Sequence, residues 1–187
     1  MRCVLVHGCP DTEERSVEPT YDEHWMPRIK QELASRHIAV DAPRMPRPWR
    51  PDYAAFKEEF EKAGITEDTI LIGHSCGCAF LVRWLGDTKR PVRKLILVAP
   101  WKIPSGDRAR QAFYSYQIDR TIRARVGEIV IFTSDDEEED GKRSAHIFHD
   151  ALGGRVIELP SHGHYTFGDM GTNEFPELLD ETLKSNL

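Results

Sequence analysis

The residue best suited to chemistry in this sequence is Ser75, in the stretch GHSCG at residues 73–77. The stretch fits the pattern G-x-S-x-G, in which a sharp turn between a strand and a helix exposes a serine hydroxyl above the edge of a sheet. An apolar run precedes the turn and a helical pattern follows it, and the small residues Gly73 and Gly77 allow chain and helix to approach closely. We therefore predict that Ser75 is a nucleophile. The alternative is a glycine-containing turn that merely includes a serine.

A serine nucleophile needs a base that accepts its proton, and an acid commonly fixes the tautomer of that base. In enzymes with this turn the acid and then the histidine often follow the serine along the chain. The stretch PSHGHYTFG at residues 160–168 is a polar loop near the C-terminus that holds His162 and His164. We predict His164 as the base, because Gly163 before it lets the loop bend back over the sheet. His162 is the alternative.

An unbroken acidic run, residues 135–140, follows the apolar stretch EIVIFT. Its first two carboxylates lie nearest the carboxyl end of the predicted strand, where ligands and reacting groups gather in open parallel sheets. We predict Asp136 as the orienting acid, with Asp135 as the alternative. Residues 137–140 are expected to be loop surface.

Backbone amides near the serine could stabilise a developing oxyanion. The amide of Cys76 lies at the predicted start of a helix, where the helix dipole adds to its effect. The stretch VHGCP at residues 6–10 offers a second donor, the amide of Cys9, with a plain glycine turn after a strand as the alternative. His74 fills the variable position of the serine motif and is expected to pack or to support the site indirectly. All four cysteines are expected to be reduced thiols, mostly as small buried residues.

The elements that must hold these residues follow from hydrophobic patterning. Six short apolar runs predict strands at residues 2–7, 37–42, 69–74, 94–99, 128–133 and 155–160. Stretches with helical spacing predict helices at residues 21–36, 51–64, 76–87, 141–154 and 173–185. Residues 100–126 show no clear period. The alternation predicts an α/β fold, a three-layer sandwich whose mostly parallel sheet of about six strands carries helices on both faces, in a single domain over residues 1–187.

Composition narrows the class of partner. The chain has 187 residues, 40% of them hydrophobic, which is enough for one sizeable core. Acidic residues outnumber basic ones, 31 to 25, and no basic block suggests a nucleic-acid surface. The apolar run at the N-terminus is too short for a signal peptide and nothing approaches a membrane span, so we expect a cytoplasmic protein without a membrane or nucleic-acid partner.

The sequence resembles the small serine hydrolases typified by retinoblastoma-binding protein 9, within the α/β-hydrolase superfamily. The likeness covers nearly the whole chain and is carried by LVHGCP, HWMPRIKQEL, ILIGHSCGCAFLVRW, IVIFTSDD and HGHYTF. It implies a compact hydrolase without a large cap, with Ser75, Asp136 and His164 at its triad positions. That family often places a proline after the aspartate, whereas Glu137 follows Asp136 here, so the choice between Asp135 and Asp136 stays open. No Leu-x-Cys-x-Glu stretch supports a retinoblastoma-protein partner.

We therefore expect hydrolysis of a carboxylic ester or thioester, with amides as a further class, through an acyl-enzyme and without a cofactor or metal. The substrate would be a small molecule or an acyl compound, and any protein partner is unknown. The alternative is an interaction module on a hydrolase scaffold with little turnover. A metal hydrolase is disfavoured because His162 and His164 lack a suitably spaced further ligand. Four aromatic residues could line an acyl pocket or could equally close the core: Trp101, Phe113, Tyr114 and Tyr116.

Overall fold

The four inner strands of the central sheet form from short runs of β-branched residues and leucines that are mostly buried, whereas the two edge strands are partly exposed. The computed structural model describes residues 1–10, 24–104, 106 and 108–184, and in these ranges a parallel sheet of six strands has the order β2-β1-β3-β4-β5-β6. The strands are β1 (Arg2–Val6), β2 (Ala39–Asp41), β3 (Thr69–His74), β4 (Val92–Val98), β5 (Val126–Ser134) and β6 (Arg155–Leu159). The predicted fold class is confirmed.

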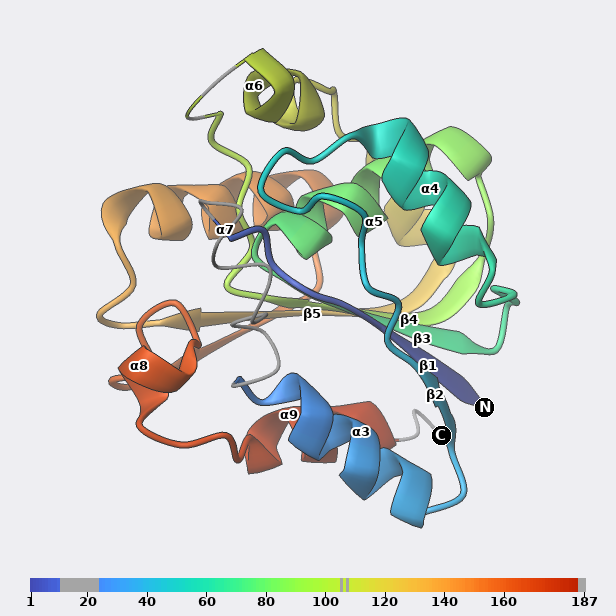
Figure 1. Cartoon of the computed structure of the whole chain (residues 1–187), viewed down its shortest axis with the longest axis vertical. Helices are drawn as coiled ribbons and strands as arrows, with labels where there is room; N and C mark the ends of the chain where they lie inside the picture. The colour runs from blue at the N-terminus through green and yellow to red at the C-terminus, as the bar shows by residue number, and fades with distance from the viewer. Residues whose placement is uncertain (11–23, 105, 107, 185–187) are drawn as a thin grey trace.

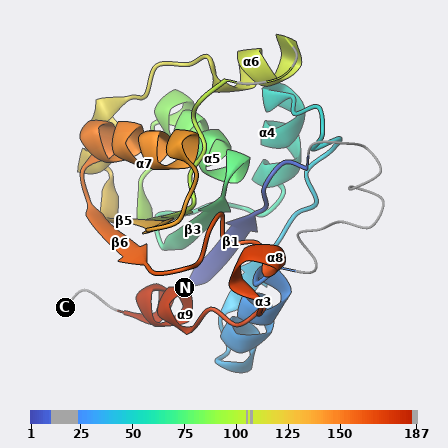
Figure 2. The same cartoon turned by 90° about the vertical axis from the view of Figure 1, so that its left-hand side faces the viewer.

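Helices cover both faces of this sheet (Figures 1 and 2). The helices α4 (Tyr53–Glu61), α5 (Cys76–Thr88) and α7 (Glu139–Leu152) lie on one face. The helices α3 (Met26–Ser35) and α9 (Pro176–Leu183) lie on the other. The remaining helical segments are α6 (Arg108–Tyr114), the 3₁₀ turn η1 (Arg120–Ala124) and the short α8 (Phe167–Met170).

The two faces of the sheet support separate hydrophobic clusters. One cluster joins β-strand side chains to α4, α5 and α7, and the other joins them to α3 and α9. The first seven residues of α5, 76–82, are all buried, as expected for a helix that lies centrally on the sheet. The site described below is built where this helix begins.

Several predicted elements begin or end elsewhere than expected. β2 is shorter than the predicted strand 37–42, because His37 has a φ of 61° and turns the chain before the strand starts. Of the predicted helix 21–36, residues 26–35 are helical and Trp25 occupies the N-cap, while residues 21–23 lie outside the described part. The helix predicted at 173–185 begins at Pro176, since proline fits the first turn of a helix but not its interior. The stretch 100–126, without a clear period, contains α6 and η1.

A helix that crosses a bilayer needs about 20 consecutive, mostly apolar residues. In the part of the chain that the structure describes, none of the helices has the length and apolar character required to cross a membrane.

Candidate active site

Ser75 lies at a strained turn between β3 and α5. Its backbone has φ 51° and ψ −119°, a conformation that side-chain-bearing residues rarely adopt. A Cβ at Gly73 would lie 2.9 Å from the amide nitrogen of Cys78, and one at Gly77 would lie 2.4 Å from the carbonyl oxygen of Val6. Glycine is therefore required on both sides of the serine, because any side chain would push the turn away from β1 and α5.

His164 is hydrogen-bonded to the serine. Its Nε2 atom lies 2.8 Å from Ser75 Oγ, across 89 residues of sequence. The loop that carries it between β6 and α8 is fixed at both sides of the imidazole: Gly163 has a φ of 46°, and the buried Tyr165 donates its hydroxyl to Thr133 O at 2.6 Å. The structure thus brings together the two residues that sequence patterning had singled out, and His164 is held in reach of the hydroxyl proton.

The carboxylate at the other ring nitrogen is Glu137. Its Oε2 and Oε1 atoms lie 3.0 and 3.2 Å from His164 Nδ1, and its side chain is only 1% exposed. The Glu138 backbone amide donates to Oε1 at 3.1 Å. Because a carboxylate accepts hydrogen bonds, Nδ1 carries the proton of the neutral imidazole, and the lone pair of Nε2 faces the hydroxyl of Ser75.

The expectation that Asp136 contacts the base is therefore wrong. Asp136 Oδ1 accepts from the Ser134 hydroxyl at 2.5 Å and from the Gly163 amide at 2.8 Å, and these donors, the hydroxyl first, hold the pKa of Asp136 below its ordinary value. Its carboxylate thereby fixes the backbone of the loop that carries His164. The short side chain of Asp136 ends at these donors, whereas the longer side chain of Glu137 reaches the imidazole.

The alternative acid and the alternative base also serve the loop. Asp135 Oδ1 accepts from the Ser161 amide at 2.8 Å. His162 Nδ1 lies 2.7 Å from Pro160 O, and its ring packs against Tyr165 with 5.3 Å between centroids. These contacts hold His162 and Asp135 to the loop backbone, so the structure does not place either of them at Ser75.

His74 links the nucleophile strand to the base. The residue is 4% exposed, and its Nε2 lies 2.9 Å from the backbone carbonyl of His164. Burial is the main cause that holds the pKa of His74 well below its ordinary value, so the ring is neutral and donates its Nε2 proton to that carbonyl. The position that the motif leaves variable thus anchors the loop of the base.

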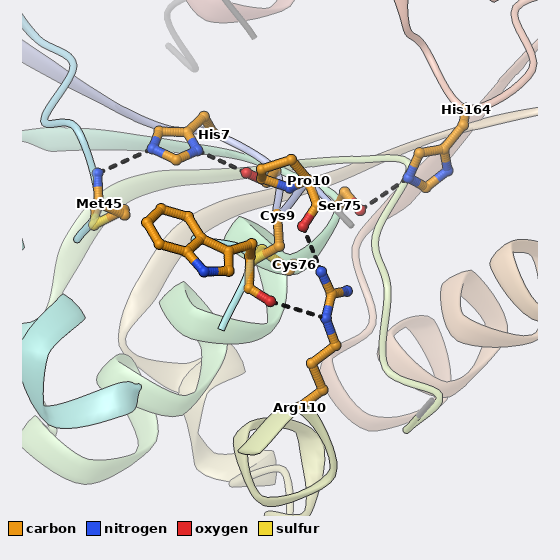
Figure 3. Close-up of a disulfide and its surroundings, with 10 residues drawn as sticks. His7, Cys9, Pro10, Met45, Ser75, Cys76, Arg110 and His164 are labelled. Atoms are coloured by element: carbon orange, nitrogen blue, oxygen red, sulfur yellow. Dashed lines mark hydrogen bonds between the residues drawn. A yellow bond between two sulfur atoms is a disulfide. The ribbon is translucent and has the colours of Figure 1, made fainter. Parts of the chain in front are cut away.

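The two residues predicted to supply oxyanion donors are covalently joined. Cys9 and Cys76 form a disulfide with 5.7 Å between their Cα atoms (Figure 3). The expectation of four reduced thiols is therefore wrong for this pair, because the end of β1 and the start of α5 bring together residues 67 positions apart in sequence. It is confirmed for Cys3 and Cys78, which are free and buried.

The four aromatic residues considered for an acyl pocket have different surroundings. Trp101 lies against the base, with its ring centroid 5.6 Å from that of His164. Phe113 and Tyr114 are each 3% exposed and belong to the core, and Phe113 also lines a cavity of about 510 Å³ beside α4 and α6. Tyr116 donates its hydroxyl to Ala79 O at 2.8 Å. Of the four, Trp101 is the one that the structure brings to the reacting groups.

Sequence reasoning missed Glu137, although one signal was present. A Cβ at Gly141 in α7 would lie 2.5 Å from the Cδ atom of Glu137, so a glycine at this helical position leaves room for the buried carboxylate. α7 begins at Glu139, two residues before the predicted start at Gly141, so this glycine lies within the first turn of the helix, where glycine is less favourable than alanine and calls for a packing reason.

Comparison with solved structures supports the same architecture. The ydeN gene product from B. subtilis is 20% identical, and the superposition covers 97% of both chains with a TM-score of 0.82. Est1E from Butyrivibrio proteoclasticus is 14% identical, with a TM-score of 0.64 over 97% of this chain and 86% of that one. A putative YdeN-like hydrolase from Pectobacterium atrosepticum is 20% identical, with a TM-score of 0.58 over 95% and 91% of the two chains. These identities establish the fold alone.

Sequence comparison assigns the family. No curated protein sequence matches this chain. The family model described as serine hydrolase matches residues 6–183, nearly its whole length. The chain therefore belongs to the serine hydrolase family.

Proposed function

We propose that this chain hydrolyses carboxylic esters or thioesters through Ser75, His164 and Glu137. The observation that carries the proposal is the continuous chain of contacts in which Ser75 Oγ lies 2.8 Å from His164 Nε2 and Glu137 Oε2 lies 3.0 Å from His164 Nδ1. The sequence motifs that resemble those of the hydrolases typified by retinoblastoma-binding protein 9 also support this proposal.

In the first half of the reaction Ser75 Oγ attacks the carbonyl carbon while His164 Nε2 takes the hydroxyl proton. The carbonyl oxygen gains the electron pair, and the backbone amides of Cys9 and Cys76 are proposed to stabilise its negative charge. When the carbonyl re-forms, the bond to the leaving group breaks, and the imidazolium returns its proton to the departing oxygen or sulfur.

In the second half, water attacks the acyl-serine, and the same imidazole takes a proton from that water. Collapse of the second tetrahedral species releases the acid and returns the proton to Ser75. Glu137 stays ionised throughout and stabilises the imidazolium by its charge and hydrogen bond. We rank esters and thioesters above amides because alkoxide and thiolate leaving groups depart more readily than amines.

The experiment combines an active-site probe with an aryl ester substrate. Wild type is expected to be labelled by a fluorophosphonate and to hydrolyse p-nitrophenyl acetate, whereas Ser75→Ala should lose both activities and His164→Asn should lose nearly all hydrolysis. His162→Asn is the matched control, since its ring contacts the loop and not the serine, and it should retain activity.

A folded wild type that neither reacts with the probe nor hydrolyses the ester would refute the proposal. That outcome would favour an interaction module on a hydrolase scaffold.

A further inference from the structure

The Cys9–Cys76 disulfide joins the two backbone segments that flank the nucleophile. Cys76 follows Ser75 directly and is the first residue of α5, and Cys9 lies three residues beyond the end of β1. Their Cα atoms are 5.7 Å apart. The cross-link therefore sets the separation of the two peptides whose amides are proposed to bind the oxyanion.

The sulfurs lie away from the reacting groups. Cys76 is fully buried in the hydrophobic cluster under α4, α5 and α7, and Cys9 is half-buried and packs against the same cluster. Figure 3 shows the disulfide to one side of Ser75, whose hydroxyl points the other way toward His164. The bridge therefore does not lie between Ser75 and His164. Cys9 is the less buried of the two cysteines, so a small dithiol is expected to reach the bridge from its side.

A second contact sets the direction of the Cys9 amide. Met45 N donates to His7 Nε2 at 3.0 Å, so the ring proton is on Nδ1, which donates to Gly8 O at 2.6 Å (Figure 3). Because the peptide bond is trans, the Cys9 N–H points away from that carbonyl. The His7 contact therefore fixes the rotation of this peptide, and the disulfide fixes its distance from Cys76.

We infer that the Cys9–Cys76 disulfide is a positioning cross-link for the oxyanion donors, and that its reduction by a dithiol slows turnover at Ser75. The inference rests on the proposed function. In the chemical step, one thiolate of the dithiol attacks Cys9 Sγ and expels the Cys76 thiolate, and the second thiolate then displaces Cys9. The protein gains two thiols as the dithiol becomes a disulfide, so two electrons and two protons are transferred in total.

The expected effect is on the rate of chemistry. Removing one oxyanion donor outright lowers kcat by about 10²–10³. Reduction leaves the donor in place but releases its distance constraint, so we expect a smaller loss in kcat, about tenfold, with KM nearly unchanged because the oxyanion exists only at the transition state.

The test measures kcat and KM for p-nitrophenyl acetate before and after dithiothreitol treatment, with thiols counted by alkylation and mass spectrometry. Wild type should lose kcat on reduction and recover it on reoxidation. The double variant Cys9→Ser/Cys76→Ser should show the low kcat throughout and no response to dithiothreitol. Cys3→Ala, which removes a buried free thiol, should respond as wild type does. If the double variant does not fold, Cys9→Ala alone serves the same comparison.

Fluorophosphonate labelling of the reduced protein, followed to completion, distinguishes a folded but slower active site from unfolded protein. A positioning role predicts that all chains become labelled, at a reduced rate. Unchanged kcat after proven reduction, with Ser75 still labelled, would overturn this inference and leave the proposed function standing. If reduction instead lowers the fraction of protein that can be labelled, and this decrease accounts for the whole loss of kcat, the inference is also overturned, because that result indicates general unfolding. A wild type unlabelled in both redox states would overturn the proposed function and this inference together.

Discussion

Replacing Glu137 with glutamine tests the assignment of the acid most sharply. The Glu138 amide donates to Oε1 at 3.1 Å, so the carbonyl oxygen of a glutamine must take that place. Its NH₂ group then occupies the position of Oε2, which lies 3.0 Å from His164 Nδ1. This donor is nearer to Nδ1 than the carbonyl oxygen, which takes the place of Oε1 at 3.2 Å, so it opposes a proton on Nδ1 and favours the imidazole tautomer with its proton on Nε2. In this tautomer the base presents a proton to Ser75 Oγ, so it has no lone pair for the hydroxyl proton.

The size of the effect follows from the same tautomer exchange in serine proteases. A wrongly protonated histidine lowers kcat there by about 10⁴-fold, which corresponds to about 5 kcal/mol of transition-state stabilisation. We expect a loss of this order for Glu137→Gln. KM should change little, because the buried carboxylate contacts the imidazole and is not expected to touch substrate.

The assay is the initial rate of p-nitrophenyl acetate hydrolysis at neutral pH, with Asp136→Asn as the matched control. Its Oδ1 can still accept from the Ser134 hydroxyl and the Gly163 amide, so its kcat should stay within about tenfold of wild type. A large loss in Asp136→Asn together with an active Glu137→Gln would refute the reasoning.

Three further predictions concern the buried acid, the loop of the base and the stability of the fold. Gly141→Ala places a methyl group against the carboxylate of Glu137, so kcat should fall by about 10²-fold even though alanine favours the helix; an unchanged kcat would show that the carboxylate can move freely. The pKa of Asp136 is lowered chiefly by the Ser134 hydroxyl, so its contribution to stability is present above the ordinary carboxyl pKa of about 3.9 and is lost as pH falls through the lowered value. Urea unfolding of wild type and Asp136→Asn should therefore differ at neutral pH and converge in acid, whereas a gap that persists in acid would rule out this linkage. Lys94 Nζ is buried 2.7 Å from Oε2 of Glu128 in β5. Lys94→Met should therefore lower the free energy of unfolding by about 3 kcal/mol and leave fluorophosphonate labelling of the folded protein intact. Equal stability of the variant and wild type would show that the buried charge is dispensable.

The sheet and the nucleophile turn could be predicted because their signals are local. A buried strand requires a continuous apolar run, and the turn at Ser75 requires glycines at residues 73 and 77, both of which are visible in the local sequence. The base loop carries a similar signal in Gly163, whose φ of 46° suits glycine. These features depend on backbone conformation over a few residues.

The acid could not be predicted in this way, because the run of carboxylates at residues 135–140 offers the same chemistry at every position. The choice depends on side-chain length and on which loop amides are within reach. Asp135 and Asp136 satisfy amides of the loop that holds His164, and the residue one position further on extends to the imidazole.

The disulfide could not be predicted either, because no local sequence feature marks Cys9 as the partner of Cys76 among the four cysteines. The pairing depends on the register in which Val6 of β1 lies opposite Gly73 of β3, which brings the two strand ends together. Side-chain reach and strand register are properties of the assembled fold.

The central claim is that Ser75 is the nucleophile, and mapping a fluorophosphonate adduct by mass spectrometry tests it most directly. We expect one adduct per chain, located on Ser75 and absent from Ser75→Ala. An adduct on any other residue, or a folded wild type that remains unmodified, would contradict it.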